Sequence, residues 1–349
     1  MRFYTKQHRF YCGVDLHART MHLCILDSDG QVVFDKNLPA TGQAFLRAIA
    51  PFRDGLVVAV ECLFCWYWLA DLCAKEQIAF VLGHALYMKA IHGGKAKNDR
   101  IDAGKIARLS RGGNLPQAYV YPAGMRETRD LLRRRQYLVR KRTEALAHIQ
   151  NTNTQYNHPP FGKQLGPAAN RAELAVADRF TDPSVHKTIE IDLALIEHYE
   201  ALLDDVERYL TDTAKVDDLQ AYYRLQTIGG VGKILALVLL YEIHDIRRFA
   251  DVGHFLSYAR LVRCEHSSAG KRQGSGGKKI GNPHLRWAIG EAACMMVRHY
   301  TRAEQWLERQ AKKRGKGKAM GILAAKLGRA VYQVLSKQVA FDERRFWNS

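Results

Sequence analysis

Four carboxylates stand at positions from which they could share a metal ion. Asp15 ends the apolar run CGVD, and Glu61 ends the apolar run GLVVAVE. Asp99 and Asp102 lie three residues apart in the basic segment GGKAKNDRIDAGKIARL, a spacing that puts both on one helix face. Converging carboxylates repel one another unless cations intervene, and Mg²⁺, with Mn²⁺ as a substitute, suits oxygen ligands and can polarise a scissile phosphate. The alternative is four surface acids, each paired with a neighbouring Lys or Arg.

A serine-containing loop offers a candidate nucleophile. The segment HSSAGKRQGSGGKK, residues 266–279, holds Ser267 and Ser268 close to Lys271 and Arg272. A hydroxyl beside cations, on a loop made flexible by glycines, could attack a phosphodiester. Most serines in such loops only shape a turn, so this pattern alone leaves both interpretations open.

Several basic or glycine-rich stretches are candidates for contact with nucleic-acid phosphates. In the turn TIGGVGK, residues 227–233, glycines would let the N–H groups that open a helix approach a phosphate; the alternative is an ordinary turn between core helices. The runs RRRQYLVRKR and KKRGKGK fit either phosphate contact or solvated charge. The residues predicted to bind nucleic acid are Lys95, Lys97, Arg133, Arg134, Arg135, Arg140, Lys141, Arg142, Gly230, Gly232, Lys233, Lys271, Arg272, Lys278, Lys279, Lys312, Lys313 and Arg314.

The elements that must position the first two carboxylates follow from hydrophobic pattern. Residues 9–36 predict three short antiparallel strands, of which the first ends at Asp15. A helix capped by Thr41, a strand ending at Glu61, a helix over residues 66–76 and a strand over residues 78–83 follow. This order is typical of an RNase H-like α/β sheet, in which carboxylates from strand ends converge on metal ions.

The rest of the chain reads as helices. Residues 99–111 predict a helix on which both aspartates share a face with Ile106 and Leu109. Residues 124–155 form a long basic helix, followed by a helix whose apolar residues, from Ile189 to Val206, approach a heptad repeat. That repeat favours either a dimerising coiled coil or an intramolecular hairpin. From about residue 217 the pattern predicts helices joined by a glycine turn and two basic loops, the second containing KKRGKGK.

The amino-acid composition limits the classes of molecule that the protein is expected to bind. The 349 residues carry a net charge of +18, which indicates nucleic acid as the leading partner class, with a membrane surface as the competitor. The longest apolar runs, such as ILALVLLYEI, are too short to span a bilayer, and the first residues lack the apolar region of a signal peptide. Seven cysteines, an odd number, are typical of reduced thiols in the cytoplasm.

Taken together, the motifs GVDLH, VAVECLF, KNDRIDA, GGVGK and SSAGKRQGSGGKKIGNPHLR resemble the DEDD transposases of insertion-sequence family 110, which include the Piv invertases. KNDRIDA fits the family pattern K-[ND]-D-x-x-D-A. The second half fits S-S-G-G-K-R followed by K-x-G-N-x-H-L-R, except that Ala269 stands where glycine is usual. ECLFCWYW replaces the frequent E-[AS]-[TC]-G-x-Y, with Tyr67 at the aromatic position. The resemblance covers nearly the whole chain.

The resemblance implies a fold and a set of catalytic residues. Residues 1–122 would form a RuvC-like RNase H domain, residues 123–215 a basic helix and coiled-coil linker, and residues 216–349 a mainly helical transposase domain with the serine loop. Asp15, Glu61, Asp99 and Asp102 would be the metal-binding tetrad. Ser267 would be the nucleophile, with Ser268 as the alternative.

The resemblance also implies partners and a reaction. Family members are guided by a structured non-coding bridge RNA, one part of which pairs with target DNA and another with donor DNA. The serine would form a 5′-phosphoserine, and strands would exchange through a Holliday junction. In the family the tetrad and the serine meet between subunits, so a tetramer assembled as a dimer of dimers is expected.

Two other functions remain as alternatives. The first is a Mg²⁺-dependent junction resolvase or nuclease, in which water attacks and Ser267 only binds phosphate. The second is a non-catalytic nucleic-acid-binding protein whose acids only form salt bridges, and whose binding would survive the loss of all four carboxylates.

Overall fold

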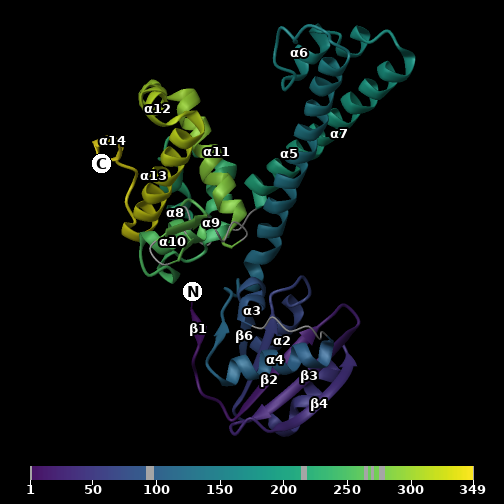
Figure 1. Ribbon diagram of the computed structural model, residues 1–349, viewed down its shortest axis with the longest axis vertical. Coiled ribbons are helices and arrows are strands. Elements are labelled where there is room, and N and C mark those ends of the chain that lie inside the picture. The colour runs from purple at the N-terminus through teal and green to yellow at the C-terminus, as the bar shows by residue number, and fades with distance from the viewer. Residues whose placement is uncertain are drawn as a thin grey trace. The chain divides into compact units, whose positions relative to one another are not determined.

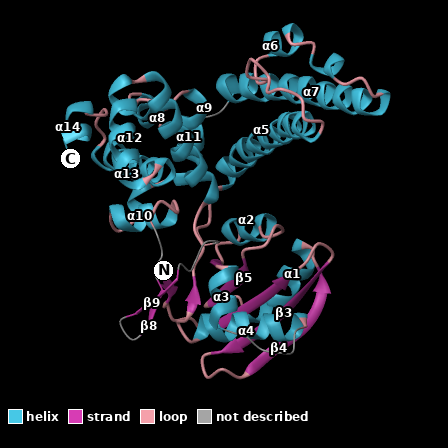
Figure 2. Ribbon diagram, turned by 45° about the horizontal axis from the view of Figure 1, so that its top comes forward, coloured by secondary structure: helices cyan, strands magenta, loops and turns pink. Residues whose placement is uncertain are grey.

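The computed structural model describes residues 2–91, 98–213, 218–262, 266–268, 271–274 and 280–348; for residues 89–91, 266–268 and 271–274 only the backbone is described. The chain divides into two compact units, Met1–Ala123 and Gly124–Ser349. The first is mixed α/β and the second is mostly helical, as expected from the sequence (Figures 1 and 2). The finer division near residue 215 stays a prediction.

A five-stranded sheet forms the centre of the first unit, in the order β4-β3-β2-β5-β6. The strands are β2 (Phe10–Leu16), β3 (Thr20–Asp27), β4 (Val32–Pro39), β5 (Leu56–Glu61) and β6 (Ala79–Gly83). β2, β3 and β4 are antiparallel, whereas β5 and β6 run parallel to β2. β2 and β5 are almost wholly buried, as expected for central strands rich in β-branched and aromatic residues. The predicted strands and their order are confirmed, and the sheet is consistent with an RNase H-like domain.

Helices cover both faces of this sheet. α1 (Gly42–Ile49) and α2 (Tyr67–Lys75) pack on one face, where the core includes Phe45, Leu69 and Val58. α4 (Asp99–Arg111) packs on the other face through Ile106 and Leu109. Thr41 caps α1 by accepting a hydrogen bond from the Ala44 N–H, as the sequence predicted.

Four short elements of the first unit were not predicted. β1 (Phe3–Tyr4) pairs with β7 (Leu115–Pro116), and α3 (Ala85–Ile91) follows β6. A single turn of 3₁₀ helix, Ala50–Phe52, extends α1. A two-residue strand is too short to carry a periodic signal. The pairing of β1 with β7 also joins segments that lie more than 100 residues apart in the sequence.

The second unit begins with a long helical hairpin. α5 (Ala123–Gln155) and α7 (Pro183–Thr213) are its arms, and α6 (Ala168–Glu173) and a 3₁₀ turn, Val176–Arg179, lie in the connection. Ile189 and Ile196 of α7 pack with Ile149 of α5. The heptad-like row of α7 therefore faces α5 of the same chain, which is the intramolecular one of the two expected arrangements.

The remaining helices pack around the hydrophobic helix α9. They are α8 (Leu219–Gln226), α9 (Lys233–Ile243), α10 (Val252–Tyr258), α11 (Pro283–His299), α12 (Thr301–Arg314), α13 (Lys316–Lys337) and α14 (Glu343–Asn348), with a 3₁₀ turn at Ile246–Arg248. α9 is buried all round, and one core joins it to α5, α11 and α13. Within the described parts of the chain, no helix is long and apolar enough to cross a membrane.

Two predicted loops differ in the structure. The serine segment was predicted as a flexible loop, but β8 (His266–Ser268) pairs with β9 (Lys271–Gly274) as a short antiparallel hairpin. The segment KKRGKGK was also predicted as a loop, but only Gly315 interrupts α12 and α13. Gly315 has a positive φ of 82°, and this one residue is enough to redirect the chain between two helices. Charge density alone did not reveal either arrangement.

Candidate active site

Asp15 and Glu61 occupy neighbouring positions where two parallel strands end. The register of β2 and β5 pairs the residue before Asp15 with the residue before Glu61. Side chains alternate along a strand, so Asp15 points to the same face as Gly13, and Glu61 to the same face as Ala59. Gly13 and Ala59 both face α4. The two acids therefore lie on the α4 face of the sheet, as the strand-end pattern predicted.

The start of α4 brings the other two acids to this edge. Asn98 caps the helix by accepting a hydrogen bond of 2.8 Å from the Ile101 N–H, and Asp99 and Asp102 occupy the first turn. Negative charge is favourable there because the helix N-terminus carries a partial positive charge. The Arg100 guanidinium donates to Asp35 of β4 at 2.6 Å, which ties the first turn of α4 to the sheet.

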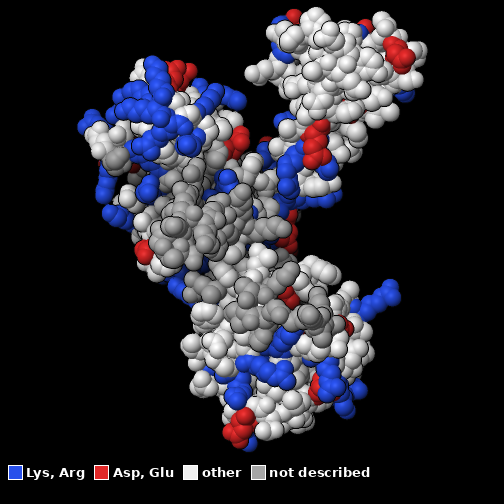
Figure 3. All heavy atoms as spheres, viewed as in Figure 1, with Lys and Arg blue, Asp and Glu red and all other residues white. Residues whose placement is uncertain are grey.

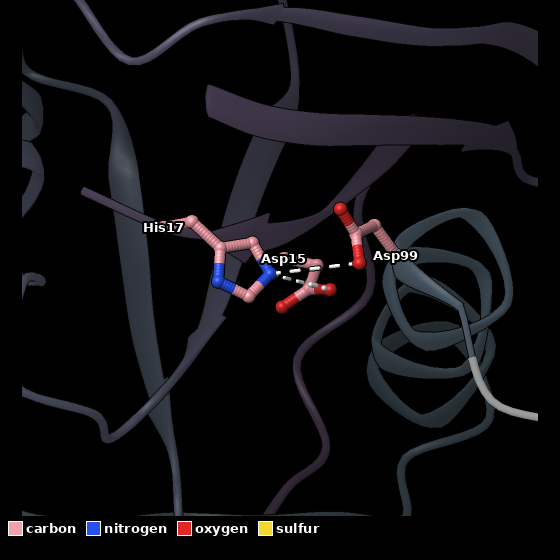
Figure 4. Close-up of side chains that lie close together, drawn as sticks. All are labelled: Asp15, His17 and Asp99. Atoms are coloured by element: carbon pink, nitrogen blue, oxygen red, sulfur yellow. Dashed lines mark ion pairs between the residues drawn. The ribbon is translucent and has the colours of Figure 1, made fainter. Parts of the chain in front are cut away.

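Asp15, His17 and Asp99 form a compact cluster (Figure 4). His17 Nε2 lies 3.4 Å from Asp15 Oδ2 and 3.6 Å from Asp99 Oδ1, and one ligand atom of each residue lies within 4.8 Å of the others. The Asp15 side chain is only 9% exposed, whereas the His17 and Asp99 side chains are about half exposed. The cluster therefore has one buried carboxylate and an open side toward solvent.

The electrostatics of Asp15 show how closely the acids are gathered. Burial is the main cause of its raised pKa; His17 opposes this effect, and the negative charges of Asp99 and Asp102 add to it. A cation between the carboxylates would offset the burial and the repulsion together. Asp102 has a partner of its own, since Lys105 Nζ lies 3.2 Å from its Oδ1.

The structure thus brings Asp15 and Asp99 together, places Asp102 one turn further along α4, and places Glu61 beside Asp15 through the strand register. Sequence reasoning missed His17. In VDLH the histidine stands two positions after Asp15 but beyond Leu16, the last residue of β2, so strand alternation alone does not place its side chain. Carboxylate and imidazole donors at these distances fit a divalent cation: oxygen ligands suit Mg²⁺ and Mn²⁺, and an imidazole suits transition metals.

The serine hairpin belongs to the second unit. In its register Ser267 lies opposite Arg272, and Ser268 lies opposite Lys271. From residue 280, where the described chain resumes, the backbone is held by α10 and the residues after it: Asn282 N donates to Tyr258 O at 2.6 Å, and Arg260 Nε donates to the carbonyls of residues 280 and 281. Positions 278 and 279, predicted to bind nucleic acid, lie outside the described residues.

A buried polar network holds this anchor against the base of α5. Glu242 of α9 accepts hydrogen bonds from Arg129, Arg133 and Asn282 at 2.6–3.1 Å. Burial would raise the pKa of Glu242, but Arg133, Arg129 and Asn282 outweigh burial and lower it to about 2. Asn282 also caps α11, because its side chain accepts from the N–H groups of His284 and Leu285.

The basic run of α5 is largely paired inside the unit. Arg133 binds Glu242, Arg135 binds Glu207, Lys141 binds Glu144, and Arg142 lies 3.7 Å from Glu200.

Arg134 and Arg140 are exposed, as are Lys312, Lys313 and Arg314 at the end of α12, where Figure 3 shows a dense group of cations. Lys95 and Lys97 lie outside the described residues. The predicted nucleic-acid contacts stay predictions, with the exposed cations as their best candidates.

The glycine turn before α9 lines a cavity of about 680 Å³. Gly230 has a φ of +87°, and a Cβ there would lie 2.2 Å from the Ala292 carbonyl oxygen, so close packing against α11 requires this glycine. Gly232, just before α9, has open space around it, and Lys233 and Arg208 also line the cavity. Gly230 is thus explained by packing, whereas phosphate contact at Gly232 and Lys233 stays a prediction.

Comparison with known proteins gives this arrangement a context. Residues 12–158 match the profile DEDD_Tnp_IS110, described as "Transposase", and residues 222–308 match the profile described as "Transposase IS116/IS110/IS902 family". The chain is 25% identical to the transposase for insertion sequence element IS1111A of Coxiella burnetii, over 94% of this chain and 90% of that protein. It is 24% identical to a probable family 20 transposase of Pseudomonas aeruginosa, over 94% and 97%. It is also 24% identical to the transposase for insertion sequence element IS1328 of Yersinia enterocolitica, over 95% and 98%.

The fold and the acidic site define an enzyme of the DEDD class, which uses a divalent metal ion to cleave and rejoin DNA. Both matched profiles describe the same kind of transposase, and between them they cover most of the chain. The chain belongs to the IS110 family of transposases.

Proposed function

We propose that this transposase is an RNA-guided, site-specific DNA recombinase that excises and inserts its own mobile element, acting in the cytoplasm on the nucleoid. The observation that carries the proposal is the convergence of Asp15 and Asp99 on one point beside the end of β5, where Glu61 lies. A buried acid with a raised pKa beside a second carboxylate is costly for the fold, which is typical of sites that bind cations.

Asp15, Glu61, Asp99 and Asp102 would hold Mg²⁺, for which Mn²⁺ could substitute. When bound, the metal ions would polarise the scissile phosphate and neutralise negative charge that develops during strand transfer. The strand ends and the first turn of α4 fix the carboxylates on rigid elements. The exposed side of the cluster leaves room for a phosphodiester.

The nucleophile would be Ser267, with Ser268 as the alternative. The Oγ–P bond forms as the bond from phosphorus to the 3′ oxygen breaks; the serine loses its proton and the 3′ oxygen gains one. The product is a 5′-phosphoserine and a free 3′-hydroxyl, so the ester conserves the bond energy and no nucleotide cofactor is needed. Lys271 and Arg272, opposite the two serines in the hairpin register, support this role because cations stabilise the charge on a reacting phosphate.

The predicted partners are double-stranded donor and target DNA and a structured bridge RNA. The net charge of +18 and the exposed cations of α5 and α12 support nucleic-acid binding. Base pairing by the RNA would choose the DNA sequences, and exchange would pass through a Holliday junction.

A homo-oligomer, assembled as a dimer of dimers, would bring the serine of one subunit to the carboxylates of another. α7 supports self-association, because it carries a second apolar row besides the one that faces α5. Ile191, Leu195, Leu202 and Tyr209 recur at intervals of four and seven residues and are 37–58% exposed. Such a spacing is typical of a helix that packs against another helix, and a second copy of this chain is the partner we propose.

A suicide-substrate assay tests the proposal. Wild type, Ser267→Ala, Ser268→Ala, Asp102→Ala and the control Ser336→Ala, which changes an exposed serine of α13, are incubated with nicked donor DNA, the RNA encoded beside the gene and Mg²⁺. Denaturing electrophoresis then separates protein-linked DNA from free DNA.

We expect a protein-linked band that is lost in one serine variant and in Asp102→Ala but is kept in the control. Free 5′-phosphate ends that persist in both serine variants would instead mean that water attacks, as in a junction resolvase or nuclease. Binding without any cleavage, unaffected by loss of the carboxylates, would favour a non-catalytic nucleic-acid-binding protein.

A further inference from the structure

The loop that follows β5, residues 62–66 with the sequence CLFCW, presents an unusually exposed aromatic side chain. Phe64 is 83% exposed, the largest value among the large hydrophobic residues of the described chain, and its neighbour Leu63 is 39% exposed. An apolar ring exposed to this extent gains free energy when a partner covers it, because its surface is then removed from water.

The loop is well anchored although Phe64 is exposed. Cys62 N donates to Gly83 O at 2.9 Å, and the Cys65 thiol donates to Leu16 O at 3.1 Å. Trp66 is 5% exposed and stacks against Phe80 in the core. Fixed points on both sides of Phe64 hold its backbone in place, so the ring is presented by a rigid support.

The loop lies beside the carboxylate cluster. Phe64 is three residues after Glu61, and its neighbour Cys65 bonds the carbonyl of Leu16, the residue after Asp15. Burial is the main cause of the raised pKa of Cys65, and the charge of Asp15 raises it further, which shows that the loop and this carboxylate are close. A phosphodiester at the cluster would therefore bring its flanking nucleotides within reach of the loop.

We propose that Phe64 stacks on a nucleobase next to the scissile phosphate and so positions the DNA strand in the acidic site. This inference rests on the proposed function, which places a phosphodiester at that site. Every base has a π-face, so stacking would operate on any sequence and would suit an enzyme whose DNA sequences are chosen by another molecule. A nucleobase is the favoured occupant because the loop adjoins the acidic site, where the proposed function places DNA cleavage, in a chain of net charge +18.

Photocrosslinking tests the stacking contact directly. The probe is a forked DNA duplex whose unpaired arms carry 5-iododeoxyuridine in place of thymidine, mixed with the full-length protein and irradiated. The variants are Phe64→Ala, Phe64→Trp, Asp15→Asn and the control Tyr223→Ala, which removes another exposed aromatic ring, on α8. Each reaction is normalised to the bound fraction, and crosslinked peptides are mapped by mass spectrometry.

We expect the wild-type crosslink to map to residues 62–66 and its yield to fall about fivefold or more in Phe64→Ala, in line with the usual strength of base–aromatic stacking. Phe64→Trp and Tyr223→Ala should keep the yield. Because Phe64 is on the surface, its replacement by alanine should not unfold the protein. Bound DNA that crosslinks elsewhere, or a yield unchanged in Phe64→Ala, would overturn the inference, as would a protein–protein crosslink from a photoreactive phenylalanine analogue at position 64.

Asp15→Asn separates this inference from the proposed function. It should keep the crosslink and lose Mg²⁺-dependent cleavage. Cleavage that depends on Asp15 without a crosslink at the loop would leave the proposed function intact and remove the role of Phe64. A crosslink at the loop together with cleavage that does not need Asp15 would keep the contact of Phe64 with DNA and contradict the proposed function of the carboxylates.

Discussion

Gly13 of β2 lies so close to Ala103 of α4 that a Cβ at Gly13 would be 2.1 Å from the Ala103 carbonyl oxygen. It would also lie 2.4 Å from the Ala107 amide nitrogen. Both obstacles are backbone atoms of a helix, which cannot turn aside as a flexible side chain can. The absence of a side chain at Gly13 therefore sets the depth at which α4 packs, and with it the distance between Asp99 and Asp15.

Gly13→Ala should displace α4 without changing any carboxylate. Overpacking of this kind costs about 1–3 kcal/mol of unfolding free energy, and the shift should weaken divalent-metal binding and cleavage. Thermal unfolding followed by circular dichroism measures the loss of stability, and Mn²⁺ titration measures the weaker metal binding. Gly290→Ala is the control, since nothing lies within 4 Å of a Cβ there. Normal metal binding in Gly13→Ala would mean that the α4 packing does not set the site.

Asp15→Asn should show opposite effects with and without metal. Burial and the charges of Asp99 and Asp102 raise the Asp15 pKa, so its ionised form is unfavourable in the metal-free fold. We therefore expect the metal-free variant to be at least as stable as the wild type. Mn²⁺ at a hundred times its Kd should stabilise the wild type by about 2.7 kcal/mol and the variant far less.

Differential scanning fluorimetry with and without Mn²⁺ measures both effects. Asp54→Asn is the control, because its side chain is 94% exposed in the same unit and should respond to Mn²⁺ like the wild type. An equal Mn²⁺ shift in Asp15→Asn would contradict a metal site at this carboxylate.

Glu242→Gln should destabilise the second unit strongly. The change leaves Arg129 and Arg133 without the buried carboxylate that pairs with both. Removing one partner of a buried ion pair typically costs about 3–5 kcal/mol of unfolding free energy. Glu144→Gln breaks an exposed pair with Lys141 and should cost less than about 1 kcal/mol. Chemical denaturation followed by circular dichroism compares the unfolding free energies of the two variants. Equal losses of unfolding free energy would show that the Glu242 network adds little to stability.

The second unit should also lose stability in acid because of His284. The pKa of His284 is lowered from 6.5 to about 4: burial is the main cause, the nearby arginines add to it, and Glu242 opposes it. The unfolded chain then binds a proton between these values that the folded chain does not, so stability falls as pH drops from about 6.5 to about 4. His284→Asn should flatten this part of a plot of Tm against pH, whereas His254→Asn, which changes an exposed histidine, should not. An unchanged slope in His284→Asn would assign the acid sensitivity to other groups.

Sequence patterns predicted the sheet and the position of each carboxylate because both depend on local periodicity. Asp15 and Glu61 end apolar runs, and Asp99 and Asp102 open a helix whose apolar face is evident. His17 could not be assigned, because its contact with Asp99 depends on how closely α4 packs on Gly13. The arginine run of α5 was predicted as a phosphate surface, yet Arg133 pairs with Glu242, which lies 109 residues further along the chain. Partners at such separations leave no periodic signal.

The heptad of α7 illustrates the same limit, because its spacing fitted either a hairpin or a dimer. The structure shows the row of Ile189 and Ile196 packed against α5, and a second row exposed on another side of the helix. Leu195→Lys combined with Leu202→Lys places two charges in this exposed row. If a second copy of the chain covers the row, desolvating two ammonium groups should disrupt the oligomer and leave the hairpin folded.

Size-exclusion chromatography with light scattering measures the oligomer, and far-ultraviolet circular dichroism checks the helices. Glu197→Lys is a matched control: it also adds two units of positive charge to α7 and lies on the surface away from the exposed row. We expect the double variant to shift to lower mass while the control keeps the mass of the wild type. The double variant should also lose protein-linked DNA in the suicide-substrate assay, because the serine and the carboxylates would no longer meet between subunits. A double variant with unchanged mass would show that α7 does not join the subunits through this row.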